Sequence, residues 1–429
     1  MRLAAFLALT AVACSSSVVT PDGDGGGGAG IGGASSVGGG GTGGSGGDTS
    51  MLPCTQLEPA GESFVVSKGG NGLLLSATSE GQAYLHFREP TGGVGYLLEP
   101  WTEWPPGVAL AHNFEQTYNA VRVVPGLQGW VTIGALWGDS STPGLLTRVF
   151  LDLKDAETPT AAPLSDEQVY GFWRTADGYA YGTSDSQDLV LHAVDDTAAP
   201  VWSRSGLGCA VGSNTILPTE SGTLLVGASV GARGPACIGG YSHLQVFALD
   251  SDGDGDGVLV PDLSPGDVDV TRFLPREAGA RLVYWRATTT LPGVPTAPGV
   301  PHDVDYGVWW TVAVSDDGAL LDEPKQLAMG APLGKRAEIA PVRNGFVGAG
   351  RARAAADLTD EVVLDLYDVD GKLLQSVATG ETAPAYDFGI RVLESPNGRS
   401  VLLGWARQRD DLKTWESEER LLRFDCVEP

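Results

Sequence analysis

The feature that most constrains this chain is a unit that recurs seven times from residue 51 onward. Each unit holds a glycine-containing turn, a short apolar strand ending in small residues, and a second alternating strand that ends at an acidic turn. A period near two and many β-branched and aromatic residues predict strands. The first strands of the units read GLLLSAT from Gly72, GWVTIGA from Gly129, GYAYGTS from Gly178, GTLLVGAS from Gly222, ARLVYWRA from Ala280, GFVGAGRA from Gly345 and RSVLLGWA from Arg399.

Units spaced about 54 residues apart suit the four-stranded blades of a β-propeller, since one blade cannot bury both of its faces alone. Stacking neighbouring blades in a ring covers those faces. We therefore predict an all-β fold over residues 52–429, a seven-bladed propeller whose strands A to D run outward from the axis. The glycine-led strands are then the B strands, and the acidic-ended strands are the C strands. A pair of two-sheet sandwiches is the structural alternative.

Residues 1–13 have the pattern of a signal peptide. Arg2 supplies the positive charge, and the apolar run that follows is too short to anchor the chain across a bilayer. The run ends in AVAC at Cys14, which resembles the lipobox of bacterial lipoproteins, with Ala11 where that family usually has leucine. The resemblance implies cleavage before Cys14 and lipidation of its thiol, and Ser15 in place of aspartate favours the outer membrane. An ordinary secretory signal beside an unrelated cysteine is the alternative.

Residues 14–51 form a separate segment that is rich in glycine and serine. Such a composition buries too little apolar surface to offset its ordering entropy, so we predict a flexible tether with a span of roughly 35 Å. The net charge of −26 repels both phosphate backbones and anionic headgroups. We therefore expect no nucleic-acid partner, and contact with the membrane only through the lipid anchor.

The cysteines test the propeller prediction. With Cys14 lipidated, four cysteines remain in an exported protein, which indicates two disulfides. The last unit ends after its C strand, so the segment after Cys54 is the available D strand, and its start faces the end of the C strand at Cys426. The model therefore predicts a Cys54–Cys426 bond, with Cys209 and Cys237 paired within the fourth unit. Free or metal-bound thiols are the alternative.

The run DSDGDGDG, which starts at residue 250, resembles the DxDxDG calcium loop of EF-hands, dockerins and integrin-type propellers. Alternating aspartates let several oxygen ligands converge while glycine permits the tight bend. Val258 and Pro261 occupy the positions where that loop places its later ligands, so the closing carboxylate is missing. A C–D hairpin turn, as at residues 315–318 and 368–371, is the alternative. The sequence indicates no other cofactor. The candidate calcium ligands are Asp250, Asp252, Asp254 and Asp256.

The longest departures from the minimal unit fall in the B–C loops, at residues 138–144, 231–241, 287–306, 352–360 and 408–418. Loops carry function when a rigid scaffold positions them, so we predict a binding face there. The candidate residues on or beside this face are Trp137, His302, Asp303, Asp305, Arg407, Arg409 and Trp415.

Two functions agree with these features. The first is a tethered, non-enzymatic binding module that recognises a protein or a carbohydrate, because no Ser/His/Asp arrangement with a recognisable spacing is present. The second is a propeller-type polysaccharide hydrolase or lyase that uses two carboxylates at the central opening. The residues that would form such a pair come from different blades, so the sequence leaves both functions open.

Overall fold

The computed structural model describes residues 53–78, 81–89, 92–99, 101–114, 118–125, 130–136, 148–152, 168–185, 188–197, 199–207, 209–231, 242–261, 268–276, 278–292, 303–335, 337–353, 359–384, 390–408 and 417–427. By internal contacts the chain divides into Met1–Val37 and Gly38–Pro429, and every described residue belongs to the second unit. Within the described ranges the secondary structure is entirely β. None of these residues forms a helix with the length and apolarity that a membrane crossing requires.

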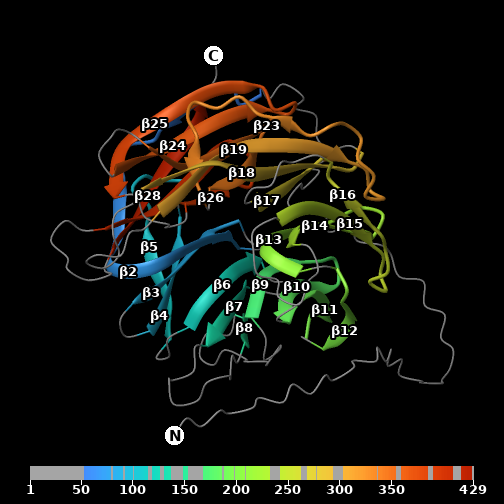
Figure 1. Ribbon diagram of the computed structural model, residues 1–429. Helices are drawn as coiled ribbons and strands as arrows, with labels where there is room; N and C mark the ends of the chain where they lie inside the picture. The colour runs from blue at the N-terminus through green and yellow to red at the C-terminus, as the bar shows by residue number, and fades with distance from the viewer. Residues whose placement is uncertain are drawn as a thin grey trace, which may run out of the picture. The chain divides into compact units, whose positions relative to one another are not determined.

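The described strands form five antiparallel sheets in a propeller-like arrangement (Figure 1). In the three smaller sheets, strands that are consecutive in the chain lie side by side. These sheets contain β6 (Tyr118–Pro125), β7 (Trp130–Leu136) and β8 (Arg148–Asp152); β9 (Gln168–Arg174), β10 (Gly178–Asp185), β11 (Asp188–Asp195) and β12 (Pro200–Arg204); and β13 (Cys209–Pro218), β14 (Leu224–Gly231), β15 (Ser242–Leu249) and β16 (Gly257–Leu259).

The nine-stranded sheet joins two groups of consecutive strands through a short bridging strand, β21, which pairs with both β19 and β23. Its strands are β17 (Val268–Pro275), β18 (Ala280–Pro292), β19 (Asp303–Val314), β21 (Leu333–Gly334), β23 (Gly345–Arg353), β24 (Thr359–Asp368) and β25 (Leu373–Pro384), with β20 (Lys325–Gln326) on β19 and β22 (Glu338–Val342) on β23.

The eight-stranded sheet joins the two ends of the described chain. The first half of β2 pairs with β28 and its second half pairs with β3, so one long strand belongs to two groups. The strand order is β26 (Ile390–Glu394), β27 (Ser400–Gln408), β28 (Ser417–Val427), β2 (Phe64–Ala77), β3 (Ala83–Glu89), β4 (Gly92–Leu98) and β5 (Val108–Phe114), with β1 (Gln56–Pro59) paired to β28.

Two features of the predicted repeat need correction. The seven units do not form seven separate sheets, because β21 and β2 each join two neighbouring units into one sheet. In the first unit, the strand led by Gly72 is the second half of β2 and lies first in the group β2–β5, where the prediction made it the second strand. The reason is that the chain before Gly72 pairs with β28, which leaves no room for an earlier strand in that unit.

The groups follow one another around the molecule through contacts of their first strands. The first strand of each group contacts the first strand of the next group along the chain, and β26, in the last group, contacts β2, in the first group. The contacting pairs are β2 with β6, β6 with β9, β9 with β13, β13 with β17, β17 with β22, β22 with β26, and β26 with β2.

Apolar clusters fill the spaces between neighbouring groups. Trp285, Trp309 and Trp405 are fully buried in them. A Cβ atom on Gly348 would lie 2.7 Å from Nε1 of Trp309, which accounts for a glycine in the middle of β23. This small residue of a predicted strand therefore makes space for a large side chain of the neighbouring group.

The chain ends are closed as the sequence predicted. β1 pairs with β28, with Leu57 opposite Cys426, and a disulfide joins Cys54 to Cys426. The side-chain amide of Gln375 accepts a hydrogen bond from the Leu57 N–H (2.7 Å) and donates one to its carbonyl (3.1 Å), which pairs the outer edge of β1. Cys209 begins β13, but Cys14, the tether and Cys237 lie outside the described residues, so their proposed roles stay predictions.

Candidate functional site

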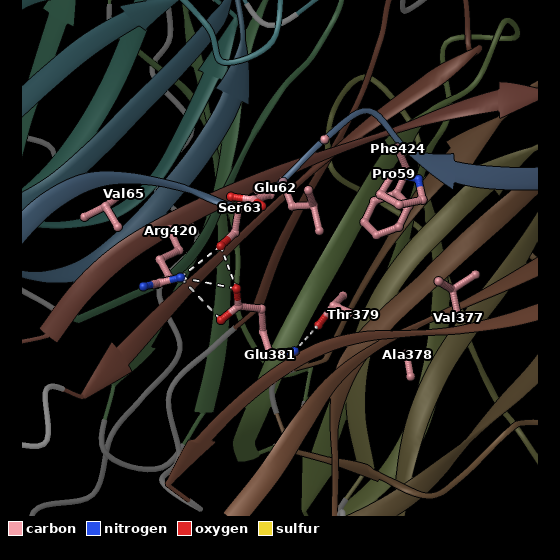
Figure 2. A pocket seen from close by; sticks show the side chains of 12 residues that line it. Pro59, Glu62, Ser63, Val65, Val377, Ala378, Thr379, Glu381, Arg420 and Phe424 are labelled. Atoms are coloured by element: carbon pink, nitrogen blue, oxygen red, sulfur yellow. Dashed lines mark hydrogen bonds and ion pairs between the residues drawn. The ribbon is translucent and has the colours of Figure 1, made fainter.

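One pocket among the described residues lies where two strand irregularities face each other. On one side, β1 ends at Pro59 and β2 begins at Phe64; the Ala60 N–H still donates to the Arg423 carbonyl of β28 (2.8 Å), and residues 61–63 interrupt the regular pairing. On the other side, the pairing of β25 with β24 changes register between Thr382 and Ala378. Between them is a cavity of about 520 Å³ (Figure 2), which is within the usual size range of small-ligand sites.

The register change in β25 is a bulge formed by Thr379, Gly380 and Glu381. Gly380 has φ +74°, a left-handed conformation that other residues rarely adopt. The Thr379 hydroxyl donates to the Val362 carbonyl (2.9 Å) and accepts from the Glu381 N–H (3.1 Å), and the Gly380 N–H donates to Glu361 (3.2 Å). Bulges re-aim side chains at strand edges, and this bulge directs the Glu381 carboxylate at Arg420 (Figure 2).

Glu381 is the centre of a charged network. Ser63 donates its hydroxyl hydrogen to Glu381 (2.6 Å), and Arg420 donates to Glu381 (3.2 Å) and to Ser63 (2.9 Å). Arg420 also pairs with Glu418 (3.1 Å), and Nη1 of Arg407 lies 3.8 Å from the Glu381 carboxylate. The Arg420 and Glu381 side chains are only 17% and 21% exposed, so solvent screens this pair less than an open surface pair.

The opposite wall of the pocket is apolar. Phe424 and Leu422 of β28 are almost fully buried beneath it, and Val377 of β25 is half-buried beside them. Glu62 is the remaining charged residue of the lining, and among the described residues its exposed carboxylate has no ion pair or hydrogen bond. The site therefore combines an apolar wall, a self-paired charge network and one unpaired carboxylate.

The structure describes three of the seven residues predicted for the binding face. Arg407 joins the pocket network through Glu381. Asp303 and Asp305 lie at the start of β19, in a different group of strands, where the Asp305 carboxylate accepts a hydrogen bond from Thr290 (2.7 Å). The others lie outside the described residues, and these are Trp137, His302, Arg409 and Trp415.

A second polar cluster, which the sequence analysis missed, joins the B–C ends of two strand pairs. The Tyr306 hydroxyl lies 2.6 Å from the Asp360 carboxylate and accepts a hydrogen bond from Arg353 (2.8 Å). Arg353 also pairs with Asp360 (3.1 Å) and donates to the Pro292 carbonyl (3.0 Å). Burial raises the pKa of both Asp360 and Tyr306 above their ordinary values. The cluster therefore fixes the strand ends from which two B–C loops leave.

The aspartate run at residue 250 forms a hairpin turn. The Asp250 carboxylate accepts hydrogen bonds from the N–H groups of Asp252 and Asp254 (2.9 Å each), and Asp254 pairs with Arg204 (2.8 Å). Asp368 accepts from two following N–H groups in the same way, which supports the turn alternative. The described part of the chain contains no group of three or more His, Cys, Asp or Glu side chains arranged to hold a metal ion. Calcium binding by Asp250, Asp252, Asp254 and Asp256 stays a prediction.

The alternative prediction of a polysaccharide hydrolase or lyase requires two carboxylates at the central opening, so we consider the carboxylates on the first strands of the groups. Glu338 of β22 pairs with Arg391 (2.7 Å), and Glu394 of β26 pairs with Arg272 (2.7 Å). Glu338 also accepts from the Val392 N–H (3.1 Å), and Arg272 donates to the Ile339 carbonyl (3.2 Å). These two carboxylates hold neighbouring strands together, and each is already engaged by an arginine.

Comparison with known proteins adds a weak similarity of fold. No protein-family model matches the chain, and no curated protein matches it. Among solved structures, the AfRom2 CNH domain has 10% sequence identity and a TM-score of 0.48, covering 87% of this chain and 100% of that one. A protein of unknown function from Dyadobacter fermentans has 10% identity and a TM-score of 0.46, covering 86% and 99%.

The WD40 domain of SCAP from fission yeast has 10% identity and a TM-score of 0.35, covering 86% of this chain and 98% of that one. Because all these scores are low, the assignment of a propeller-like fold rests on the strand pairing of this chain.

Proposed function

We propose that this protein is a lipid-anchored binding module of the bacterial cell envelope. In this proposal Cys14 carries the lipid at the outer membrane, residues 14–51 form the tether, and the β domain presents a recognition site for a protein or carbohydrate. The support for the anchor is the AVAC sequence after a charged and apolar leader. The support for the tether is its glycine-rich composition.

We also propose that the β domain is a ring of seven blades. The observation in favour is the closed series of contacts among seven first strands, from β2 through β26 and back to β2. A ring suits recognition because its sheets are rigid, while loops and strand edges vary without disturbing the core.

The observation that carries the binding function is the pocket between β25 and the break at residues 61–63. A bulge, an interrupted strand and a left-handed glycine meet there, and each departs from regular strand geometry. Irregular backbone of this kind costs free energy, and it persists only where the surrounding structure enforces it. The mixed charged and apolar lining is typical of sites that orient a ligand with few polar groups.

The test uses full-length Cys14→Ala protein, which cannot be lipidated, with a fluorescent label. Binding to isolated bacterial outer-membrane and peptidoglycan fractions is titrated for this protein and for two added substitutions. Ala378→Trp fills the pocket from an exposed position on β25, and Val201→Trp places the same bulk on β12, where Val201 is 60% exposed.

We expect saturable binding that Ala378→Trp abolishes and Val201→Trp leaves intact. Equal binding by all three proteins, or saturable binding by none, contradicts the proposed site. Circular dichroism and melting curves establish that each variant is folded.

A further inference from the structure

The chemistry of the pocket limits the class of ligand that can bind there, given the binding function proposed above. Four of the five N–H donors of Arg420 are already engaged, because Nε and one Nη2 hydrogen bond to Glu418, and the two Nη1 hydrogens bond to Ser63 and Glu381. The Ser63 hydrogen is committed to Glu381. The pocket therefore offers few free donors, which disfavours an anionic ligand.

Hydrogen-bond acceptors with free capacity, in contrast, remain in the pocket. Both oxygens of Glu62 have no partner among the described residues, and Oε2 of Glu381 receives only Arg420 at 3.3 Å and the more distant Arg407. A carboxylate oxygen can accept about two hydrogen bonds. A ligand in this pocket must therefore supply hydrogens.

The charges of the site also favour a cationic ligand. Among the described residues, three carboxylates (Glu62, Glu381 and Glu418) and two arginines (Arg407 and Arg420) lie at or beside the pocket, which leaves one net negative charge there. The whole chain has a net charge of −26. A protein with this charge concentrates cations near its surface and repels anions.

We propose that this pocket binds an organic cation on a short apolar stem, namely an alkylammonium or alkylguanidinium group. The cationic end reaches Glu62 and the free side of Glu381, and the methylene stem lies against the apolar wall formed by Phe424, Leu422 and Val377 (Figure 2). Lysine and arginine side chains have this form, with an apolar stem and a charged end. A free polyamine offers the same chemistry.

The experiment uses full-length Cys14→Ala protein and isothermal titration calorimetry at low ionic strength. The probes are acetyl-lysine-amide, acetyl-arginine-amide and cadaverine, with acetyl-norleucine-amide and acetyl-citrulline-amide as uncharged counterparts. We expect the cations to bind and the uncharged probes not to bind, with affinity that falls as salt is added. Tighter binding of the amino-acid amides indicates a polypeptide ligand, and tighter binding of cadaverine indicates a free polyamine.

Three substitutions test whether the cation binds in this pocket. Glu62→Gln keeps the shape of an exposed side chain that supports no other contact, so it should fold normally and weaken cation binding about two- to fivefold, as for the loss of one exposed ion pair. Glu220→Gln removes another exposed carboxylate, from the β13–β14 turn, and should leave the affinity unchanged. Ala378→Trp should abolish the binding.

Equal binding of charged and uncharged probes overturns the proposal, as does a cation affinity that neither Glu62→Gln nor Ala378→Trp changes. Absence of cation binding overturns it as well. If envelope fractions nevertheless bind the protein and Ala378→Trp abolishes that binding, the pocket is a binding site and only the cationic ligand class is wrong.

Discussion

Removal of the bond between Cys54 and Cys426 tests how the two chain ends are held. The bond spans 372 residues of sequence, and in the chain-entropy treatment a loop of that length contributes about 6 kcal/mol, above the usual 2–5 kcal/mol for loss of a native disulfide. β1 also pairs with β28 and is bonded to Gln375 through Leu57, and we expect the double variant Cys54→Ser/Cys426→Ser to keep these contacts. We therefore expect its free energy of unfolding to fall by about 3–5 kcal/mol.

Urea unfolding followed by tryptophan fluorescence measures this loss, and calorimetry measures the melting temperature. An unfolding entropy of about 2.1 cal/mol/K per residue over ~375 residues converts the loss to a fall of about 4–6 °C in Tm. The matched control is Cys209→Ser/Cys237→Ser, whose predicted loop of about 28 residues contributes only about 3–4 kcal/mol at most. An unchanged free energy of unfolding in the Cys54/Cys426 variant would refute the reasoning, because strand pairing alone would then hold the ends.

Three other predictions concern the anchor, the buried acid and the aspartate turn. Cys14→Ala should move the protein from the membrane to the soluble fraction of cells, and continued detergent-phase partitioning of the variant would contradict lipidation. Burial raises the pKa of Asp360 above its ordinary 3.8, so the folded state binds this proton more tightly, and the stability that the protonated group provides is lost as pH rises through the folded pKa. Urea titrations from pH 3.5 to 7 should show the wild type losing stability relative to Asp360→Asn; parallel curves would contradict this. If the aspartate turn binds calcium, millimolar calcium should raise Tm and Asp252→Ala should remove the rise, whereas a Tm that ignores calcium supports the turn alone.

Much of the fold could be predicted because the repeat fixes a local pattern. Strands such as β14, β23 and β27 begin within two residues of the positions that their sequences predicted. The closure of the chain ends could also be predicted, since an outer strand without a partner leaves an unpaired edge. The segment that follows Cys54 pairs with this edge of β28 beside Cys426, and the first half of β2 continues the pairing. The Cys54–Cys426 prediction is confirmed.

The failures come from places where one strand serves two groups. β2 is fourteen residues long, and its first half pairs with a strand more than three hundred residues away. Alternation along a sequence assigns a residue to a strand but does not say with which strand it pairs. The sequence pattern therefore places the first unit one strand out of order, and it does not indicate that β2 and β21 each join two units into one sheet.

The candidate site was harder to predict than the fold for the same physical reason. Ser63 and Glu381 lie 318 residues apart in sequence, and each is an ordinary polar residue in its own segment. The local signal in β25 is Gly380, which indicates a bulge within a strand but does not identify the residue that the bulge will face. Arg407 is a candidate for the binding face because it lies beside a long loop, but the sequence of that loop does not indicate the contact with Glu381.

The pocket and the closure of the chain depend on the same segment. Residues 54–63 supply one cysteine of the disulfide, the strand β1 and one side of the pocket, while β28 supplies the other cysteine and, with Val377 of β25, the apolar wall. Glu381 and Gln375, both on β25, hold this segment at two points, the first through Ser63 and the second through Leu57. The pocket can therefore form only when both chain ends and β25 are in place. A site of this kind is absent from the unfolded chain and from any partly folded state in which the ends are apart, so ligand binding would stabilise the closed fold in addition to the disulfide.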